Sequence, residues 1–532
     1  MRLRRSLPAL TPSQIALLAL VLSAAALRLW FMLSYRPGFV GYPDARAYII
    51  AADGPLYWNP YKPVGYPLFL EALRGIDGRL SVTIAIQHLL GLATAVLLYL
   101  ATAPFVRRRW TALLPAVVVL FGGSQVFLEH AVLSDAPYTF VLVVALYCAL
   151  RGMRSDERSL WWLAAAGVAL AASATLRTVG AFLLPLFATW ILLPREQPWR
   201  ARLAGAGTML GTAGLLLIVY LIPQHAETGS WGLTRTAGFT FYARMAPLAD
   251  CTRFTPPRGT AGLCQRSEPS TRANANRYIF SAQAPAVRLY GAPPYPRTPV
   301  EQDAYRYGGD EPTRRFAKAV LVHQPLDYLA SVAEGLGNFV VPRAGRPSVF
   351  EYDQDELVTQ LHNPRFEGDA AADITSFYST RAGYLRRNVD ALDSYGRTVK
   401  LEGALTAVLA LLALAGGILG RAGARHAAAL FGASAFSLAL LPVAILFYDV
   451  RYAAPVVALL AAAAAIGTDR CCDLLGPRAR RLREQMGRSS CIMKVISCAG
   501  PGCRHIRGNP CVGGHYSLRV GRNRPARSVD PG

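Results

Sequence analysis

The stretch from Gly41 to Leu70 holds the residues best suited to chemistry, and it separates two long apolar runs. It is rich in Pro, Gly and Tyr, and it carries Asp44, Asp53 and Lys62. A positioned carboxylate of this kind can take a proton from an acceptor hydroxyl. We therefore interpret the stretch as the floor of a site at a membrane surface. The alternative is an interfacial loop whose aromatic side chains anchor to lipid headgroups.

The composition is that of a membrane protein with a sizeable polar part. The chain has 532 residues, is 53% hydrophobic and 17% charged, and has a mean hydropathy of +0.27. Its net charge of +23 does not indicate nucleic-acid binding, because no stacking-aromatic module accompanies it. The basic residues cluster instead between apolar runs and in the C-terminal tail, where membrane topology places them.

Apolar runs along the chain predict ten membrane spans, since about 20 helical residues cross a ~30 Å hydrocarbon core. The runs are Ser13–Ser34, Val82–Phe105, Trp110–Phe127, Pro137–Leu150, Leu160–Leu176, Thr178–Leu193, Leu203–Ile222, Leu401–Leu419, Ala427–Phe447 and Ala453–Ile466. We interpret the first as a retained helix rather than a signal peptide. The predicted fold class is an all-α polytopic membrane protein with one large extracytoplasmic loop.

The basic residues between the runs orient the helices. With a cytoplasmic N-terminus, every inner loop is rich in arginine, as the positive-inside rule requires. These inner segments are 107–109, 151–158, 195–202 and 421–425, with the tail after Asp469. The outer segments are then 35–81, 128–136, the turn at Arg177, 223–400 and 448–452. If one span had been missed, half of these segments would change sides. The arginine content of every inner segment therefore supports an even number of membrane spans.

The topology divides the chain into four predicted regions. Residues 1–222 form a transmembrane module with catalytic outer loops, and residues 223–400 form an extracytoplasmic region. Residues 401–469 hold the last transmembrane helices, and residues 470–532 form a basic cytoplasmic tail that we expect to be disordered. Within the second region, apolar residues at helical spacing predict a helix from Arg314 to Val340 that packs on the membrane face.

The cysteines divide between two compartments. Cys251 and Cys264 fall in an outer segment, and we expect them to form a disulfide; the alternative is two free thiols. Six of the nine cysteines lie in the tail. A zinc site there is the less favoured interpretation, because no Cys-x2-Cys pair is present. Its candidate ligands are Cys498, Cys503, His505, Cys511 and His515.

Two arginines fall within or beside apolar runs. Arg28 lies about two turns from the outer end of the first run, and we expect it to snorkel to the surface rather than bind a ligand. Arg177 lies at a hairpin tip between two short runs, slightly below the outer surface. An arginine there must pair or face a wet cavity, so we predict a functional role for it.

Acidic and basic side chains from at least five separated segments meet on the outer face in this topology. Carboxylates there can act as bases, and arginines can hold a phosphate leaving group by paired hydrogen bonds. The set consists of Asp44, Lys62, Glu129, His130, Asp135, Arg177, His225, Glu227, Asp449 and Arg451.

Five short motifs carry a family resemblance through their order and their common side. They are Tyr42–Tyr48, Lys62–Pro67, Glu129–Asp135, Thr175–Gly180 and Asp449–Pro455. With them, the chain resembles the polytopic, lipid-carrier-dependent glycosyltransferases of the GT-C type, which include protein O-mannosyltransferases and the aminoarabinose transferase of lipid A. The resemblance covers about residues 10 to 468 in layout.

The resemblance implies roles for the acidic residues. In such enzymes the acid of the first outer loop serves as the general base, which corresponds to Asp44. The acid of the second outer loop corresponds to Asp135, with Glu129 as a competitor.

The resemblance also implies a donor, a sugar carried on polyprenyl phosphate. Arg177, Arg451 and Lys62 are the residues that would bind its phosphate. Further site candidates are Tyr48, Glu129, His130, His225 and Glu227. No cofactor is firmly predicted, and a divalent metal stays open because a single aspartate replaces a paired acidic motif.

The predicted function is a multi-pass plasma-membrane glycosyltransferase whose active site faces away from the cytoplasm. It would act in contact with the lipid bilayer and move a sugar from the polyprenyl-phosphate carrier to an extracytoplasmic acceptor, a cell-envelope glycan, lipid or protein. The alternative is a transporter or flippase for an amphiphilic envelope precursor, although no inverted repeat is visible. A scaffold with a partner-binding loop would leave Arg177 unexplained.

Overall fold

The structure is a computed structural model of the chain. It describes residues 10–54, 56–57, 59–154, 159–194, 197–272, 275–291, 308–341, 361, 374–378, 385–401 and 403–497, with side chains to Leu475 in the last helix. The chain forms two units, Met1–Arg470 and Cys471–Gly532. The helices that position the site belong to the first unit.

Six helical segments within the described residues are long and apolar enough to cross a membrane. They are α1 (Pro12–Ser34), α4 (Leu80–Thr102) with η1 (Ala103–Phe105), α8 (Ser159–Leu176), α10 (Trp199–Thr228), α20 (Ala422–Ile445), and η6 (Val450–Tyr452) with the start of α21 (Ala453–Ser497). Shorter apolar helices are η2 (Thr178–Phe182) with α9 (Leu183–Leu192), and α19 (Ala404–Leu419). The helical membrane fold is confirmed, whereas the count of ten spans is not.

Two predicted spans take a different form. Pro137–Leu150 lies inside α7 (Asp135–Gly152), and Trp110–Phe127 is divided between α5 (Leu113–Phe121) and α6 (Gly123–Glu129). The division falls at Gly122, where the segment before α19 passes close by. A Cβ atom on Gly122 would lie 2.6 Å from the Leu401 side chain. The run is broken at the Gly122-Gly123 pair, because glycine is a poor helix former and its missing side chain leaves room for the Leu401 segment.

Two helices extend past their predicted ends. The sequence places a region boundary after residue 222, but α10 continues to Thr228 with Pro223 inside it. The last helix, α21, continues to Ser497, so the first part of the tail is helical where we expected disorder. The candidate ligands of a tail zinc site, the less favoured interpretation, lie outside the described residues.

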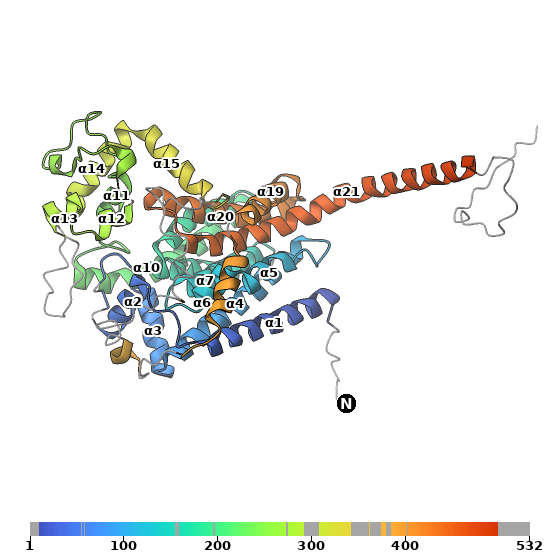
Figure 1. Cartoon of the computed structure of the whole chain (residues 1–532), viewed down its shortest axis with the longest axis horizontal. Helices are drawn as coiled ribbons and strands as arrows, with labels where there is room; N and C mark the ends of the chain where they lie inside the picture. The colour runs from blue at the N-terminus through green and yellow to red at the C-terminus, as the bar shows by residue number, and fades with distance from the viewer. Residues whose placement is uncertain are drawn as a thin grey trace, which may run out of the picture. The chain divides into compact units, whose positions relative to one another are not determined.

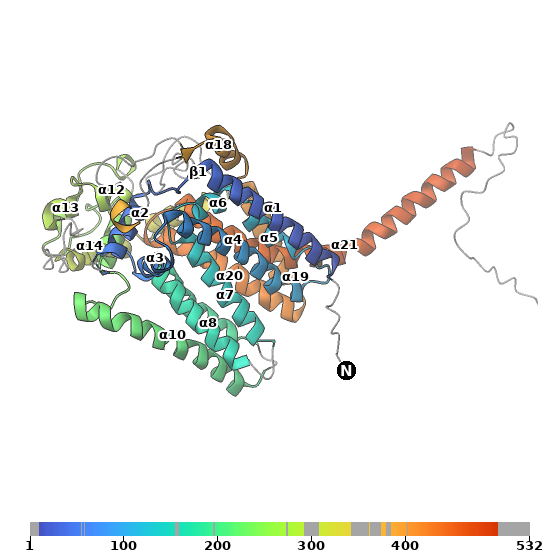
Figure 2. The same ribbon diagram turned by 90° about the horizontal axis from the view of Figure 1, so that it is seen from below.

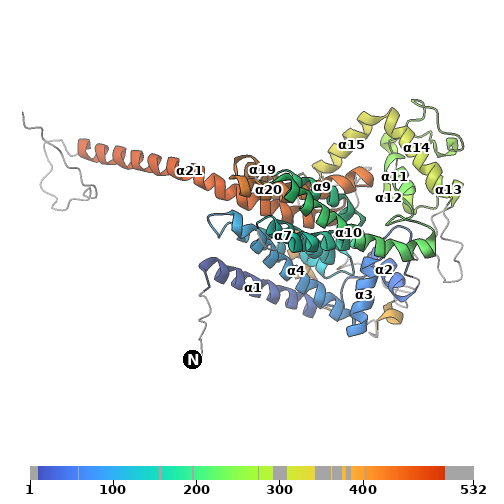
Figure 3. The ribbon, with the colours of Figure 1, turned by 180° about the vertical axis from the view of Figure 1, so that it is seen from behind.

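The helices pack as a bundle in which α8 lies between α7 and α10, and α4 contacts α1, α5 and α7 (Figure 2). Smaller helices gather at one end of it, as Figures 1 and 3 show. They are α2 (Pro43–Asp53), α3 (Gly65–Ile76), α11 (Ala237–Met245), α12 (Ala275–Phe280), α13 (Pro285–Tyr290), α14 (Asp310–His323) and α15 (Pro325–Gly337), with η3 (Ala261–Leu263) and η4 (Pro269–Thr271).

The only named strands in the described part of the chain join two distant segments. β1 (Tyr35–Arg36) follows α1 and pairs antiparallel with β2 (Leu385–Arg386), which precedes α18 (Val389–Thr398). Tyr35 lies opposite Arg386. This ladder fixes the chain directly before the stretch that carries Asp44.

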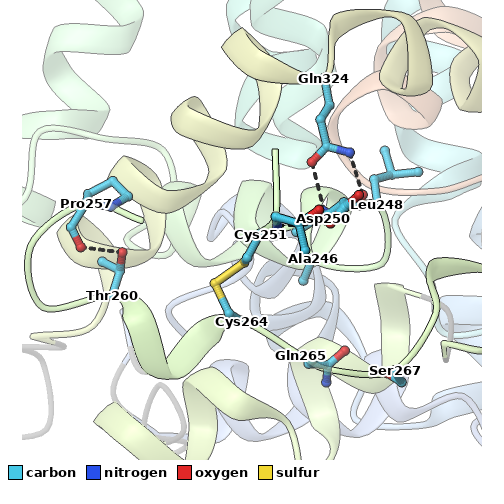
Figure 4. Close-up of a disulfide and its surroundings, with 12 residues drawn as sticks. Ala246, Leu248, Asp250, Cys251, Pro257, Thr260, Cys264, Gln265, Ser267 and Gln324 are labelled. Atoms are coloured by element: carbon cyan, nitrogen blue, oxygen red, sulfur yellow. Dashed lines mark hydrogen bonds between the residues drawn. A yellow bond between two sulfur atoms is a disulfide. The ribbon is translucent and has the colours of Figure 1, made fainter. Parts of the chain in front are cut away.

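The single helix predicted from Arg314 to Val340 is two helices, α14 and α15. The break falls at Gln324, whose backbone (φ −130°, ψ 49°) is not helical. Pro325 causes it, because a proline disfavours the helical region for the residue before it. The Gln324 side chain then bonds the Asp250 amide and the Leu248 carbonyl (Figure 4).

A disulfide links Cys251, in the segment between α11 and η3, to Cys264, which directly follows η3 (Figure 4). Their Cα atoms lie 6.0 Å apart. Both cysteines pack against a separate hydrophobic cluster that includes Phe239, Tyr242 and Phe316. The crosslink therefore lies against the core of the small helices.

Candidate functional site

Asp44 lies in the first turn of α2, at the end of the bundle where the small helices gather. The helix starts at Pro43, whose fixed φ suits a first helical position, and Tyr42 precedes it with extended backbone. A carboxylate in the first turn is stabilised by the positive end of the helix dipole. The Asp44 side chain is 25% exposed, so a substrate can reach it.

Two cations from distant segments contact the same oxygen of Asp44. The Nζ atom of Lys62 lies 2.8 Å from Oδ2, and both terminal nitrogens of Arg451 donate to it at 3.2 Å. Lys62 comes from the link between α2 and α3, whereas Arg451 lies in η6 at the start of the last helix. The structure thus brings the predicted base, Asp44, into contact with two of the three predicted phosphate ligands.

Asp449 orients Arg451. One carboxylate oxygen accepts from the Arg451 amide at 2.9 Å, and the other accepts from its Nε atom at 3.2 Å. The same side chain caps the N-terminus of η6. The guanidinium also lies over the Tyr42 ring, with Cζ 5.8 Å from its centre. Arg451 is therefore held in place while its side chain remains 11% exposed.

Arg177 forms an ion pair with Asp135. Asp135 begins α7 and is 4% exposed, and Arg177 precedes η2 and is 17% exposed. The guanidinium also lies over the rings of Tyr138 and Tyr452, at 5.8 and 5.2 Å from their centres. Tyr452 directly follows Arg451. Its ring therefore connects the ion pair of Asp135 and Arg177 to the group that Arg451 forms with Asp44 and Lys62.

The site so formed holds three carboxylates and three cations. The carboxylates are Asp44, Asp135 and Asp449, and the cations are Lys62, Arg177 and Arg451. We call these six residues the charged cluster. Its formal charges cancel, so an anion that enters must compete with a carboxylate for its cations.

The neighbouring charges decide how Asp44 titrates. Burial alone would raise the Asp44 pKa, but Lys62 and Arg451 outweigh that effect and hold it well below its usual range. Burial likewise opposes the charged form of Lys62, yet the Asp44 carboxylate raises the Lys62 pKa. Both groups are therefore ionised at neutral pH. The resting Asp44 carboxylate is ready to accept a proton but is a weak base.

Tyr48 links the segment that carries Asp44 to the segment that carries Asp135. Its hydroxyl lies 3.1 Å from the Ser134 hydroxyl, next to Asp135. Its ring packs edge-on against Tyr66 at 4.7 Å, and the Lys62 ammonium lies 5.3 Å from the ring centre. Tyr48 thus belongs to the site as a neighbour of Lys62, and it holds the two acid-bearing segments together.

Glu129 and His130 lie elsewhere, in a buried network inside the bundle. Glu129 is 0% exposed, and its carboxylate accepts from Arg28 at 2.7 and 2.9 Å. His88 lies 3.0 Å from the same carboxylate and 3.1 Å from His130. A substrate cannot reach fully buried side chains, so the expectation that these two residues line the site is not supported.

The same network corrects the interpretation of Arg28. The sequence predicts that it snorkels to the surface, but it is 2% exposed and also donates to the Leu120 carbonyl at 2.8 Å. A buried guanidinium needs such partners because desolvation is costly. Three more polar residues belong to this network and were not predicted: His88 and Gln125 contact the Glu129 carboxylate, and Gln87 donates to the Glu129 backbone carbonyl. The sequence does contain a sign of this network. Polar residues inside an apolar run usually pair with one another or have a function.

His225 and Glu227 lie in the last turn of α10. His225 stacks on Trp231 with ring centres 4.0 Å apart, and Glu227 raises the pKa of Tyr57, second to the effect of burial. Near them, Lys62 and Gln224 line a recess of about 10 Å³. These two candidates therefore lie on the helical turn that follows Gln224, and neither Trp231 nor Tyr57 is a member of the charged cluster.

The arrangement offers no evident metal centre. Within the described residues, no group of three or more His, Cys, Asp or Glu side chains could hold a metal ion. Each carboxylate of the charged cluster is bonded to a cation instead.

A comparison with known protein families matches a part of the chain that holds two of the five sequence motifs. Residues 83–222 match the family described as dolichyl-phosphate-mannose-protein mannosyltransferase. This segment runs from α4 to α10 and includes Asp135 and Arg177, but not Asp44, Lys62 or Arg451. The match confirms, over these residues, the resemblance to lipid-carrier-dependent glycosyltransferases. Among curated proteins, none matches the sequence.

Several solved structures resemble the fold at low identity. The Saccharomyces cerevisiae protein O-mannosyltransferase Pmt1–Pmt2 complex, bound to the sugar donor, is 18% identical over 45% of this chain and 37% of its own, with a TM-score of 0.33. The oligosaccharyltransferase AglB of Archaeoglobus fulgidus, with an inhibitory peptide and a dolichol-phosphate, is 13% identical over 91% and 54%, with a TM-score of 0.45.

A third solved structure is ArnT from Cupriavidus metallidurans, bound to undecaprenyl phosphate. It is 15% identical over 88% of this chain and 80% of its own, with a TM-score of 0.32. This chain spans about a third of the length of the Pmt1–Pmt2 chain that it matches and about half that of AglB.

Proposed function

We propose that this chain, whose residues 83–222 match the model of a mannosyltransferase family, transfers a sugar from a polyprenyl-phosphate carrier to an acceptor outside the cytoplasm. One observation carries the proposal. Asp44, an ionised and reachable carboxylate, shares one oxygen with Lys62 and Arg451, two cations that suit a phosphate. The base and the phosphate ligands thus lie within one ion-pair distance of each other.

The phosphate of the donor binds to Arg451 and Lys62. A guanidinium presents two parallel donors to a phosphate, and a lysine adds a point charge. Both side chains already pair with Asp44, so an arriving phosphate competes with that carboxylate. Arg177 is a third candidate because its guanidinium lies over the ring of Tyr452, the residue that directly follows Arg451.

Asp44 then acts as the base. An acceptor hydroxyl gives its proton to the carboxylate while its oxygen forms a bond to the sugar carbon. The bond between that carbon and the phosphate oxygen breaks, and the carrier leaves as a phosphate anion held by the cations. Asp44 releases its proton to water afterwards. Because the phosphate draws Lys62 and Arg451 away, the pKa of Asp44 rises towards its ordinary value and the carboxylate becomes a stronger base.

Asp135 is the weaker candidate for the base. It is 4% exposed and paired with Arg177, whereas Asp44 is 25% exposed. Its ion pair with Arg177 supports a different role for Asp135, in which the carboxylate positions the Arg177 guanidinium. The site would face outside the cytoplasm, which the arginine bias of the opposite loops supports.

The test uses the purified full chain with a panel of polyprenyl-phosphate sugars and a broad set of acceptors. We expect release of the free carrier phosphate with at least one sugar, and loss of release in Asp44→Asn. Asp53→Asn is a matched control, since Asp53 pairs with Arg74 at the far end of α2 and is 31% exposed. If proteoliposomes move a labelled carrier across the bilayer without cleaving any sugar, the transporter alternative is correct.

A further inference from the structure

A second recess lies at the opposite end of the bundle from the charged cluster. It has a volume of about 630 Å³, which is the size of a ligand pocket. It lies where α7 and α9 end and where α20 begins. Asp135 starts α7, and 18 residues of helix, or about 27 Å, separate it from this end. The recess is therefore not part of the proposed donor site.

The walls of the recess are apolar and aromatic. Phe105, Leu150, Trp190 and Leu193 line it together with the first turns of α20. Trp190 forms a firm wall, because its ring stacks on His426 at 4.3 Å and its Nε1 atom donates to the His426 carbonyl at 2.9 Å. A free inorganic anion would gain nothing from such walls, whereas a hydrocarbon chain would.

Two arginines give the recess a positive rim. Arg154 follows α7, lies over the Phe105 ring at 5.3 Å and is exposed, and Arg425 is exposed in the first turns of α20. The described lining residues include no acid. Both arginines lie in segments that the positive-inside rule places at a membrane surface. An apolar recess with a cationic rim at that level is complementary to a lipid with an anionic headgroup.

We propose that this recess binds an anionic phospholipid from the membrane leaflet at this end of the bundle. The acyl chains lie along Trp190 and Leu193, and the headgroup phosphate bonds to Arg154 and Arg425. Under the predicted topology this is the cytoplasmic leaflet. The proposal is independent of the glycosyltransferase assignment, because the two sites share no residue.

The test measures lipid binding rather than turnover. Delipidated full-length chain in detergent is titrated with short-chain phosphatidylglycerol or phosphatidylcholine, and bound lipid is counted by native mass spectrometry. We expect phosphatidylglycerol to bind more tightly. The double variant Arg154→Ala/Arg425→Ala should weaken its binding by roughly 10- to 30-fold, in line with the contribution of two arginines near anionic lipid.

Two further variants keep the test decisive. Gly423→Phe should fill the recess and lower binding while both arginines remain, because nothing lies within 4 Å of a Cβ atom there. Arg200→Ala should leave binding unchanged, since Arg200 also lies over an aromatic ring, that of Trp199, but outside the recess. Binding that survives both the double variant and Gly423→Phe would overturn the proposal. So would displacement of the lipid by an equal concentration of inorganic phosphate, which would reveal a site for free anions.

Discussion

Arg177 donates to Asp135, so two residues predicted for separate roles form one ion pair at the bundle end that holds Asp44. The pair is only partly open to solvent. The Tyr452 ring connects it to the other members of the charged cluster. Removal of one member leaves the other largely buried without its partner. Single substitutions in this pair therefore change both stability and chemistry, and their effects have to be separated.

Arg177→Ala should lower both stability and turnover. Loss of one partner of a buried pair costs about 3–5 kcal/mol. The double variant Asp135→Ala/Arg177→Ala should regain most of that stability, because no unpaired charge remains, yet its turnover should stay at least about tenfold low. Thermal unfolding in detergent and carrier-phosphate release separate the two effects. Recovery of full turnover in the double variant would make the pair purely structural.

Asp44→Asn should lower turnover by about 10²–10⁴-fold, which is the usual contribution of a positioned general base. The amide keeps the shape but does not take the proton. Donor binding should be retained or become tighter, because Lys62 and Arg451 no longer have a competing carboxylate. Single-turnover kinetics and donor titration measure the two quantities. A dead Asp135→Asn beside a normal Asp44→Asn would assign the base to the second acid.

The pH dependence of kcat/KM should reflect how the cations around Asp44 shift the pKa of its carboxyl group. The pKa of Asp44 is lowered in the folded protein. On the acid side, kcat/KM should therefore decline only at a pH below the ordinary aspartate pKa of about 3.9. The lowered pKa of Asp44 also stabilises the folded protein at any pH above that ordinary pKa. This stabilisation is lost as the pH falls through the lowered pKa. Lys62→Met removes one positive neighbour and should move the limb to higher pH. An unchanged limb would show that another group controls it.

Arg28→Met should destabilise the bundle without changing the substrate dependence of the reaction. The substitution leaves Glu129 at 0% exposure without its guanidinium partner, at a cost of about 3–5 kcal/mol. Arg28→Met/Glu129→Gln should recover part of this loss. Unfolding midpoints and KM for the donor are the measurements. A large rise in KM with an unchanged midpoint would place Arg28 in the substrate path.

The disulfide gives a prediction that needs no substrate. In non-reduced protein from an oxidising compartment, Cys251 and Cys264 should resist alkylation. Cys251→Ser should destabilise the small helices by roughly 3 kcal/mol, the chain-entropy value for a loop of this size. Peptide mapping and proteolysis of the α11–α14 region test the two parts. Cys148→Ser, at a buried thiol in α7, is the control that should leave this region unaffected.

The sequence predicted which residues share an end of the bundle, but not which residues touch. Asp44, Lys62 and Arg451 were grouped because the arginine bias sets the sides of the membrane, and this sidedness needs no tertiary information. Their contact depends on how segments 407 positions apart cross, which no local pattern encodes. Glu129 was misplaced for a related reason. It stands two residues after an apolar run, yet α6 turns it inward to Arg28.

The 407-residue separation of Asp44 and Arg451 also has a consequence for biosynthesis. Chains are made from the N-terminus at about 5–20 residues per second, so the Asp44 segment is complete tens of seconds before Arg451 leaves the ribosome. During that interval Asp44 has Lys62 but lacks the guanidinium that completes the cluster. A chain that stops before Asp449 would insert most of its helices and still have no working site. Under the proposed function, nascent and truncated chains would therefore not transfer the sugar, and only chains that include Arg451 would use the sugar-loaded carrier.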